Sequence, residues 1–255
     1  MSRLRSLLTA ACTIGLLFGN PASAQDQVAD EDWDYVEDVA KKTYVASVTF
    51  ASDQELQAQC YFGRFLLSLW GLPDRGQTAY TATVQIGSTP VTQVWRRKGA
   101  WLSTEPARDA RALRNGGVLP LSAPGSRLRR AISSPLELPS RHANLDKVLN
   151  ACGYALEDDR DHLPDVDTNM RLQGVRRQPT LDHEDNTGVE ISCLVANGQL
   201  EACRPHRTPQ GVRLADVEQE ARQWNGKPVH PRHTQANEGR VAHITIPMEQ
   251  VEAER

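Results

Sequence analysis

Hydrophobic and polar residues alternate along several short segments in the first half of the chain, separated by Gly, Asp and Ser. This period is typical of strands that bury one face of a sheet. The pattern therefore predicts an antiparallel meander. The expected strands cover residues 43–50, 55–61, 64–69, 80–86 and 91–95, with a further stretch at 128–138 that Pro135 limits to an edge or a bulge.

A short helix is expected at the end of this region, over residues 142–151. Leu145, Val148 and Leu149 have helical spacing, Ser140 is a plausible N-cap, and Gly153 stops the pattern. The stretch 96–126 shows no clear period and is expected to be irregular. Residues 43–156 are thus predicted to form a mainly antiparallel β domain with a C-terminal helix.

Two further segments lack hydrophobic periodicity. Residues 25–42 are acidic and are expected to be loosely ordered. Residues 157–187 begin with the charge run 157–161 and continue with Pro, Gly and Asp, which predicts an interdomain linker with solvated charges.

Periodicity returns in the last quarter of the chain. Residues 189–195 alternate, Asn197-Gly198 is a tight-turn signal, and 199–204 continue in extended form. Residues 214–224 have the three-and-four spacing of an amphipathic helix, and 240–248 alternate as a closing strand. We therefore expect an α+β fold of two small domains, the second over residues 188–250.

The N-terminus has the pattern of a cleavable export signal over residues 1–24. Arg3 and Arg5 precede the apolar run 7–18, and Ala22-Ser23-Ala24 supplies the small residues of a cleavage site. The alternative is an uncleaved anchor, but the run is far shorter than the roughly 20 residues of a spanning helix. We expect a soluble periplasmic protein without stable membrane insertion.

Four of the five cysteines follow this signal: Cys60, Cys152, Cys193 and Cys203. An even number in an exported chain favours two disulfides over free thiols. Three pairings are possible, and sequence proximity and domain organisation favour Cys193 with Cys203 and Cys60 with Cys152. Buried unpaired cysteine is the alternative. An ideal two-residue turn at Asn197-Gly198 would place Cys193 opposite Ala202, one residue short of Cys203. This disulfide therefore predicts a bulge or a three-residue loop in the hairpin.

The charge balance weighs against nucleic acid as a partner. The whole chain has a formal net charge of −3, and removing the signal, which carries two Arg and no acidic residue, makes it −5. Phosphate binding needs a clustered basic surface. The three arginines at 127, 129 and 130 are more simply a solvated face.

The last quarter resembles the C-terminal domain of TonB-type energy transducers of the Gram-negative cell envelope. The order strand, Asn-Gly turn, strand, helix, proline-containing loop and strand carries the resemblance, and a cysteine pair flanking the turn is similar to disulfide-bearing variants of that domain. The matching motifs are Gly188-Val189-Glu190-Ile191-Ser192-Cys193, Asn197-Gly198-Gln199-Leu200, Cys203, Ala221-Arg222-Gln223-Trp224, Gly226-Lys227-Pro228, Gly239-Arg240-Val241 and Ile244-Thr245-Ile246-Pro247.

The resemblance implies a ββαβ fold and a binding mode, but not energy transduction. The family's uncleaved membrane helix, long Pro-rich rod and Tyr-Pro lead-in are not found here. In such domains a partner segment adds to a sheet edge. The expected partner-binding strand consists of Arg240, Val241, Ala242, His243, Ile244, Thr245 and Ile246. The alternative is an internal strand, or an edge blunted by charge.

No catalytic motif is present, and no cofactor or metal is expected. There is no Gly-x-Ser-x-Gly, phosphate-binding loop, His-Glu-x-x-His or Cys-x-x-Cys. His230 and His233, with His206 and His243 as additions, are most simply solvent-facing loop histidines. The acidic cluster 182–185 and the pair Asp158-Asp159 lack the setting of a calcium loop or of acid catalysis.

Three functions follow, in order of preference. The first is a soluble periplasmic binding or scaffolding protein that recognises a segment of another envelope protein. The second is a periplasmic hydrolase or other envelope enzyme with its site in the first domain, within 96–126. The third is a structural protein of the cell envelope.

Overall fold

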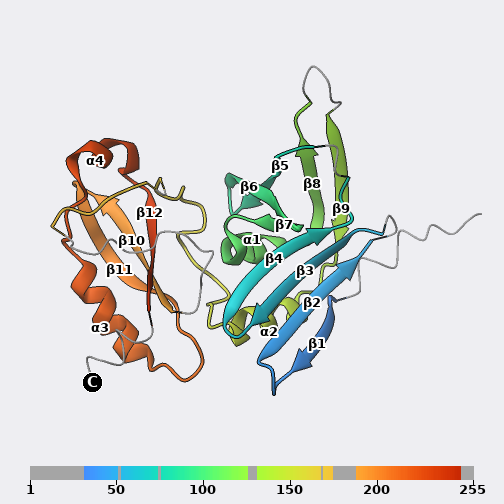
Figure 1. Cartoon of the computed structure of the whole chain (residues 1–255), viewed down its shortest axis with the longest axis horizontal. Helices are drawn as coiled ribbons and strands as arrows, with labels where there is room; N and C mark the ends of the chain where they lie inside the picture. Colours follow the sequence, from blue (N-terminus) through green and yellow to red (C-terminus); the bar gives the residue numbers. More distant parts are fainter. Residues whose placement is uncertain are drawn as a thin grey trace, which may run out of the picture.

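The computed structural model describes residues 32–50, 53–73, 76–125, 131–167, 169–174 and 188–247. Within these residues the chain forms two antiparallel sheets and four helices, so the α+β expectation holds, with strands dominant. A nine-stranded and a three-stranded sheet lie side by side (Figure 1). The predicted export signal lies outside the described residues.

The large sheet has the strand order β1-β2-β3-β4-β7-β6-β5-β8-β9. The predicted meander is present, and β9 with Pro135 is the outermost strand, as expected for a proline-containing strand. The strands are β1 (Asp34–Asp38), β2 (Thr43–Thr49), β3 (Glu55–Tyr61), β4 (Arg64–Trp70), β5 (Ala79–Ile86), β6 (Thr89–Lys98), β7 (Ala100–Ser103), β8 (Gly117–Ala123) and β9 (Ile132–Leu138).

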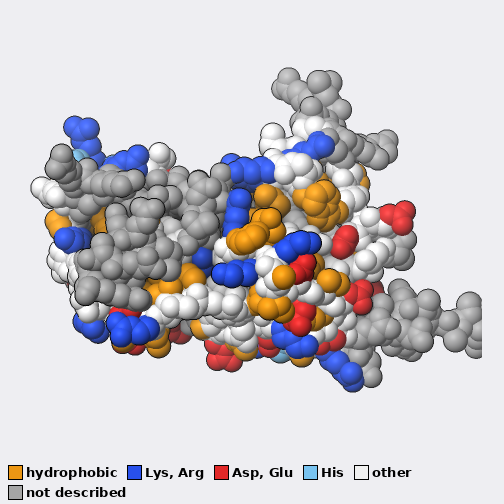
Figure 2. All heavy atoms as spheres, turned by 60° about the horizontal axis from the view of Figure 1, so that its bottom comes forward, with side chains coloured by type: hydrophobic (Ala, Val, Ile, Leu, Met, Phe, Trp, Pro, Cys, Tyr) orange, Lys and Arg blue, Asp and Glu red, His pale blue; other side chains and the backbone are white. Residues whose placement is uncertain are grey.

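One face of this sheet forms the larger hydrophobic core. Alternate residues of β3, such as Leu56, Ala58 and Cys60, are buried there. Helices α1 (Pro106–Leu113) and α2 (Ala143–Ala151) pack against this face. Residues of opposite parity project from the other face, where Val36 is 68% exposed and Trp70 48%. Hydrophobic side chains therefore reach the surface among charged ones (Figure 2).

The small sheet has the order β11-β10-β12 and a separate hydrophobic core. Its strands are β10 (Val189–Ala196), β11 (Gln199–Arg207) and β12 (Val241–Ile246). Helix α3 (Leu214–Trp224) matches the predicted bounds and buries Val217 and Ala221. Helix α4 (Pro231–Asn237) follows it in the chain.

The β10–β11 hairpin combines a tight turn with a bulge. Asn197 and Gly198 have φ of 52° and 76°, the left-handed conformation that a two-residue turn between paired Ala196 and Gln199 requires. The register then shifts between Ser192 and Leu194, and Ala202 opposite this shift has φ of 47°. The irregularity predicted from the cysteine spacing is therefore confirmed.

Three local expectations were wrong. Part of the acidic segment 25–42 is ordered as β1, because its residues pair with Thr43–Ser47 of β2. The stretch 96–126 contains β7, α1 and β8, whose short lengths hid their periods. The loop expected around Pro231 is helix α4, because a proline in the first turn of a helix needs no amide partner.

The segment expected to be a linker is packed where it is described. Met170 and Leu172 belong to the core of the small sheet. Bridges join Asp165 to Val241 and Leu172 to Val229. The charge run 157–161 joins the small sheet to α1, as described below. None of the described helices is long and apolar enough to cross a membrane.

Candidate functional site

The two faces of the small sheet carry opposite chemistry. Along β10, Val189, Ile191 and Cys193 point into the hydrophobic core. The residues between them, Glu190 and Ser192, are also fully buried, on the face turned toward the large sheet. A buried polar face needs partners for each of its groups. We call the contacts that supply them the junction.

The centre of the junction is a buried ion pair between Glu190 of β10 and Arg207 of β11. Arg207 Nη1 donates to Glu190 Oε1 at 3.2 Å, and both side chains have no exposed surface. The hydroxyl of Tyr154, which follows α2, lies 3.1 Å from both Glu190 carboxylate oxygens and donates to them. Burial, reinforced by the Glu190 charge, raises the pKa of Tyr154 well above its usual value, so the phenol stays protonated.

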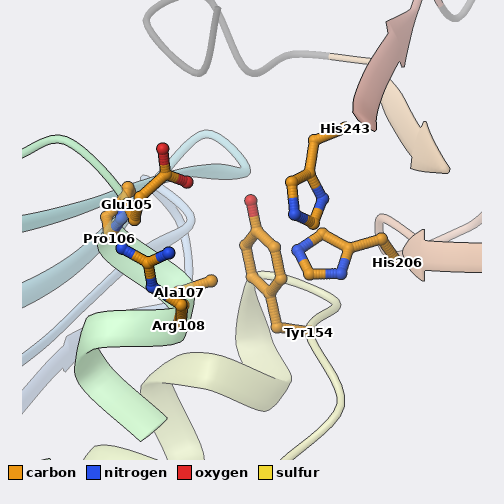
Figure 3. A pocket seen from close by; sticks show the side chains of 7 residues that line it. All are labelled: Glu105, Pro106, Ala107, Arg108, Tyr154, His206 and His243. Atoms are coloured by element: carbon orange, nitrogen blue, oxygen red, sulfur yellow. The ribbon is translucent and has the colours of Figure 1, made fainter. Parts of the chain in front are cut away.

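Two histidines meet beside Tyr154 (Figure 3). His206 comes from β11 and His243 from β12, the strands on either side of β10, and their rings lie 4.3 Å apart. Burial, with His243 nearby, lowers the pKa of His206 to about 3, so the ring is neutral at physiological pH. The solvent-facing loop interpretation is therefore wrong for His206, which is buried.

Asp158 holds the other side of His206. The neutral ring donates from Nδ1 to Asp158 Oδ2 at 3.0 Å. Burial by itself would raise the pKa of Asp158, but this hydrogen bond and one from the Arg160 amide outweigh it and hold the pKa well below its usual range. Asp158 also accepts from Arg204 at 2.6 Å.

The charge run 157–161 joins the small sheet to α1. The expectation of a solvated run was therefore wrong for Asp158, Arg160 and Asp161, while Glu157 and Asp159 are exposed as expected. Arg160 donates to the carbonyls of Ser192 and Ala202 in the small sheet, at 2.7 and 2.5 Å. Asp161 accepts two hydrogen bonds from Arg111 of α1, at 2.5 and 2.6 Å, and both side chains are buried. Two consecutive residues thus bind opposite sides of the junction.

A second acidic residue, Asp165, makes a similar bridge. It pairs with Arg108 of α1 at 2.8 Å and with His243 of β12 at 3.3 Å. Asp109, next to Arg108, is buried and accepts from Ser103 Oγ at 2.6 Å. Burial raises the pKa of Asp109 to about 7, against the opposing effects of Arg108 and Ser103.

The junction leaves almost no space for a substrate. Its cavity has a volume of about 10 Å³ (Figure 3), and it is lined by Glu105, Pro106, Ala107 and Arg108 at the start of α1, by Tyr154 after α2, and by His206 and His243 of the small sheet. That volume is about the size of one water molecule. Among the described residues no group of His, Cys, Asp and Glu has the arrangement of a metal site. The ion pairs of the junction join residues 158–165 to α1 on one side and to the small sheet on the other.

Both predicted disulfides are present. Cys60 of β3 is bonded to Cys152, which caps α2, and Cys193 is bonded to Cys203 across the β10–β11 hairpin. The first bond spans 92 residues and the second 10. The longer loop contributes more in the chain-entropy model, about 4.6 kcal/mol against about 2.7 kcal/mol.

The strand expected to bind a partner is β12, which pairs with β10 and is an outer strand of the small sheet among the described residues. Its outer side is already used at the start, because Val241 accepts from the amide of Val166 and donates to the carbonyl of Pro164, both at 2.9 Å. Arg240 binds the Asp165 carbonyl. Ala242, Ile244 and Ile246 point into the core, and His243 lies in the junction. Thr245 has the same parity as Val241, so its backbone groups also face outward.

The remaining sequence candidates lie apart from the junction. His230 caps α4 by accepting from the Arg232 amide, and its ring lies 5.9 Å from that of His233. The acidic cluster 182–185 and the arginines at 127, 129 and 130 lie outside the described residues.

Little in the sequence indicates the junction. Glu190 and Ser192 alternate with apolar residues, which predicts that they face solvent. Asp158 and Arg160 belong to a run of charged residues, which also predicts exposure. The one available signal is that His206 and Arg207 lie just beyond the strand predicted over 199–204, where a longer hairpin brings Arg207 opposite Glu190.

No family model, no curated protein and no solved structure matches this chain.

Proposed function

We propose that this chain is a periplasmic binding or scaffolding module that recognises an extended segment of another envelope protein, with a TonB-like small domain and without energy transduction. The proposed division is an export signal over 1–24, a β domain over 43–156, a connecting segment over 157–187 and the TonB-like domain over 188–250. The element order β10, β11, α3, β12 supports the likeness, and α4 is an addition to it.

The observation that carries this proposal is the position of β12 at the edge of the small sheet. An edge strand offers backbone groups to which an extended segment can bond, and alternate side chains then give selectivity. Because Val166 and Pro164 bond Val241, the start of this edge is already in use. The proposed contact is therefore shorter than 240–246 and centres on Thr245.

Thr245→Pro tests the edge directly. Proline removes an outward amide without removing a bond between β12 and β10. Glu137→Pro is the matched control. Glu137 lies on β9, an edge strand of the large sheet, two residues from Pro135, so its amide also points outward and its loss removes no bond between β9 and β8. We expect the tagged wild type and Glu137→Pro to capture the same protein from a periplasmic extract in equal amounts. Thr245→Pro should capture about one fifth of that amount or less. Equal capture by all three would exclude the β12 edge.

A further inference from the structure

The large sheet is split between β5 and β8. These strands are neighbours in the sheet, yet they pair at one position only, Thr81 with Ser122. Each is fully paired on its other side, β5 with β6 over eight positions and β8 with β9 over seven. The two hairpins extend in different directions beyond that single pair (Figure 1).

The split opens into a pocket of about 510 Å³, which we call the slot. This volume lies within the usual range of ligand sites, roughly 300–1,000 Å³. The end of α1 and the turn after it close the slot on the core side. Its lining residues are Thr83, Val84, Gln85, Gly87, Ala112, Leu113, Asn115, Gly116, Val118, Leu119 and Leu138.

The backbone of β5 faces the slot at Thr83 and Gln85. The Thr81 carbonyl accepts from Ser122 Oγ at 3.4 Å, so it points toward β8. Backbone groups alternate in direction along a strand, so those of Thr83 and Gln85 point the same way. The partner of Gln85 in β6 is Pro90, which has no amide to offer, as expected at a position where the two strands exchange no hydrogen bonds.

The backbone of β8 faces the slot from the other side. Pro120 lies opposite Pro135 of β9, and neither residue has an amide, so this pair makes no bonds within the β8–β9 ladder. By alternation the amide and carbonyl of Val118, which lines the slot, also point away from β9 and toward β5. Two strand edges of one sheet thus face each other across a pocket, without a strand between them among the described residues.

No residue that lines the slot is charged. A Lys, Arg, Asp or Glu side chain placed there would lose hydration without gaining an ion pair, which is unfavourable. The polar groups that the slot offers are backbone amides and carbonyls, with the side chains of Thr83, Gln85 and Asn115. An occupant that matches both features is an extended backbone with small, uncharged side chains.

We infer that the slot binds an uncharged, extended polypeptide segment of about four residues, which inserts between β5 and β8 and pairs with their facing edges. This site lies in the other sheet from β12 and is independent of the function proposed above. A segment bound there would have two strand neighbours instead of the one available at an outer edge.

The test uses the full-length mature protein and a labelled, capped eight-residue peptide that alternates Val with Ser and Thr. Fluorescence anisotropy would measure its dissociation constant, beside versions with Lys or Glu at the polar positions. We expect saturable binding below about 1 mM, and at least a tenfold loss for either charged version, about 1.4 kcal/mol. Absence of saturable binding at 1 mM or so, or tighter binding of a charged version, would overturn the inference.

Val118→Lys places a charge at the mouth of the slot on a side chain that is 56% exposed. We expect it to weaken peptide binding at least tenfold. Val36→Lys is the matched control, because Val36 is 68% exposed, projects from the same face of the same sheet and lies on β1 at the opposite edge. It should change binding less than about twofold, and equal losses in the two variants would contradict the slot as the site.

Thr83→Pro provides a second variant that removes an amide facing the slot while retaining the β5–β6 bonds. Unchanged peptide binding in this variant would exclude pairing with β5.

Two other occupants of the slot are distinguished in the same assay. Displacement of the peptide by equimolar octyl glucoside would show an apolar ligand site, and self-association in sedimentation that Val118→Lys abolishes would show a second copy of the chain. Either result would overturn the peptide assignment.

Discussion

The junction and the slot are two spaces between elements of the described chain, and they differ in size, in openness and in the charge of their lining. The junction is closed, about 10 Å³ in volume, and surrounded by charged and titratable side chains. The slot is open, about 510 Å³, and has no charged side chain. Clusters of perturbed titratable groups often mark reaction sites. Here they join α1 to the small sheet, and the space for a ligand is uncharged.

The difference has a physical reason. A buried ion pair needs a close partner because its charges have lost their hydration, so a charged contact surface must close tightly. At the centre of the junction Arg207 Nη1 bonds Glu190, whereas Arg207 Nε and Nη2 have no hydrogen-bond partner in the described structure, which makes the Glu190 contact the main compensation for this buried charge. Unpaired strand edges can remain open because solvent satisfies their backbone groups until a segment replaces it. The junction, which holds the ion pairs, is therefore closed, and the slot, which is bordered by strand edges, stays accessible to solvent.

The largest expected effect is loss of the central ion pair of the junction. Glu190→Ala leaves the buried Arg207 charge without its partner, and we expect the free energy of unfolding to fall by about 3–5 kcal/mol in urea denaturation. Glu218→Ala, at an exposed position on α3, is the control and should change little. A loss below about 1 kcal/mol at Glu190 would show that the junction contributes little to stability.

The next effect is acid sensitivity through His206. Its pKa is about 3 in the folded state, below the value of about 6.5 for an unperturbed histidine, so between these values only the unfolded chain binds the proton. Stability is therefore lost as the pH falls from 6.5 toward 3, by up to about 1.4 kcal/mol per pH unit. His206→Gln should reduce this slope, while His162→Gln, at an exposed position, should retain it. Identical slopes in all three proteins would contradict a neutral, buried His206.

Asp109 is expected to act in the opposite direction and more weakly. Burial raises its folded pKa to about 7, above the unfolded value of 3.8, so the folded state binds the extra proton. Its contribution is complete below pH 3.8 and is lost as the pH rises to 7. Asp109→Asn stays neutral but loses the charge contact with Arg108. The pKa shift alone corresponds to about 4 kcal/mol, and the lost contact offsets most of it, so we expect a net gain in stability at pH 8 on the order of 1 kcal/mol. A less stable variant at pH 8 would show that Asp109 functions as a carboxylate.

The smallest stability effect is expected at the slot. Val118→Lys should change the free energy of unfolding by no more than about 0.5 kcal/mol, because the side chain is largely exposed. The same variant is expected to lose peptide binding. A stability loss near that of Glu190→Ala would contradict the difference between the two regions, because it would show that Val118 of the slot stabilises the fold as much as the junction does.

The sequence predicted most individual elements, because hydrophobic periodicity is a local property. The bounds of α3 matched, and the strands of the meander and of the β10–β11 hairpin fell within a few residues of their expected positions. Helix α1 was missed because it has only eight residues and two of its charged side chains, Asp109 and Arg111, are buried. Local polarity marks such residues as exposed, and only their partners show otherwise.

The sequence by itself determined where the chain alternates and where it turns. It also favoured, among three possible pairings, the two disulfides that the structure shows, and it predicted the bulge between Cys193 and Cys203. Only the tertiary structure decided what covers each face. The partners of Arg111 and Arg160 are 50 and 32 residues away, and the strands that border the slot are 41 residues apart at Thr81 and Ser122. A pattern read along the chain records the polarity of each position but not the neighbour that meets it, and that neighbour determines whether a charge is buried and whether a strand edge stays open.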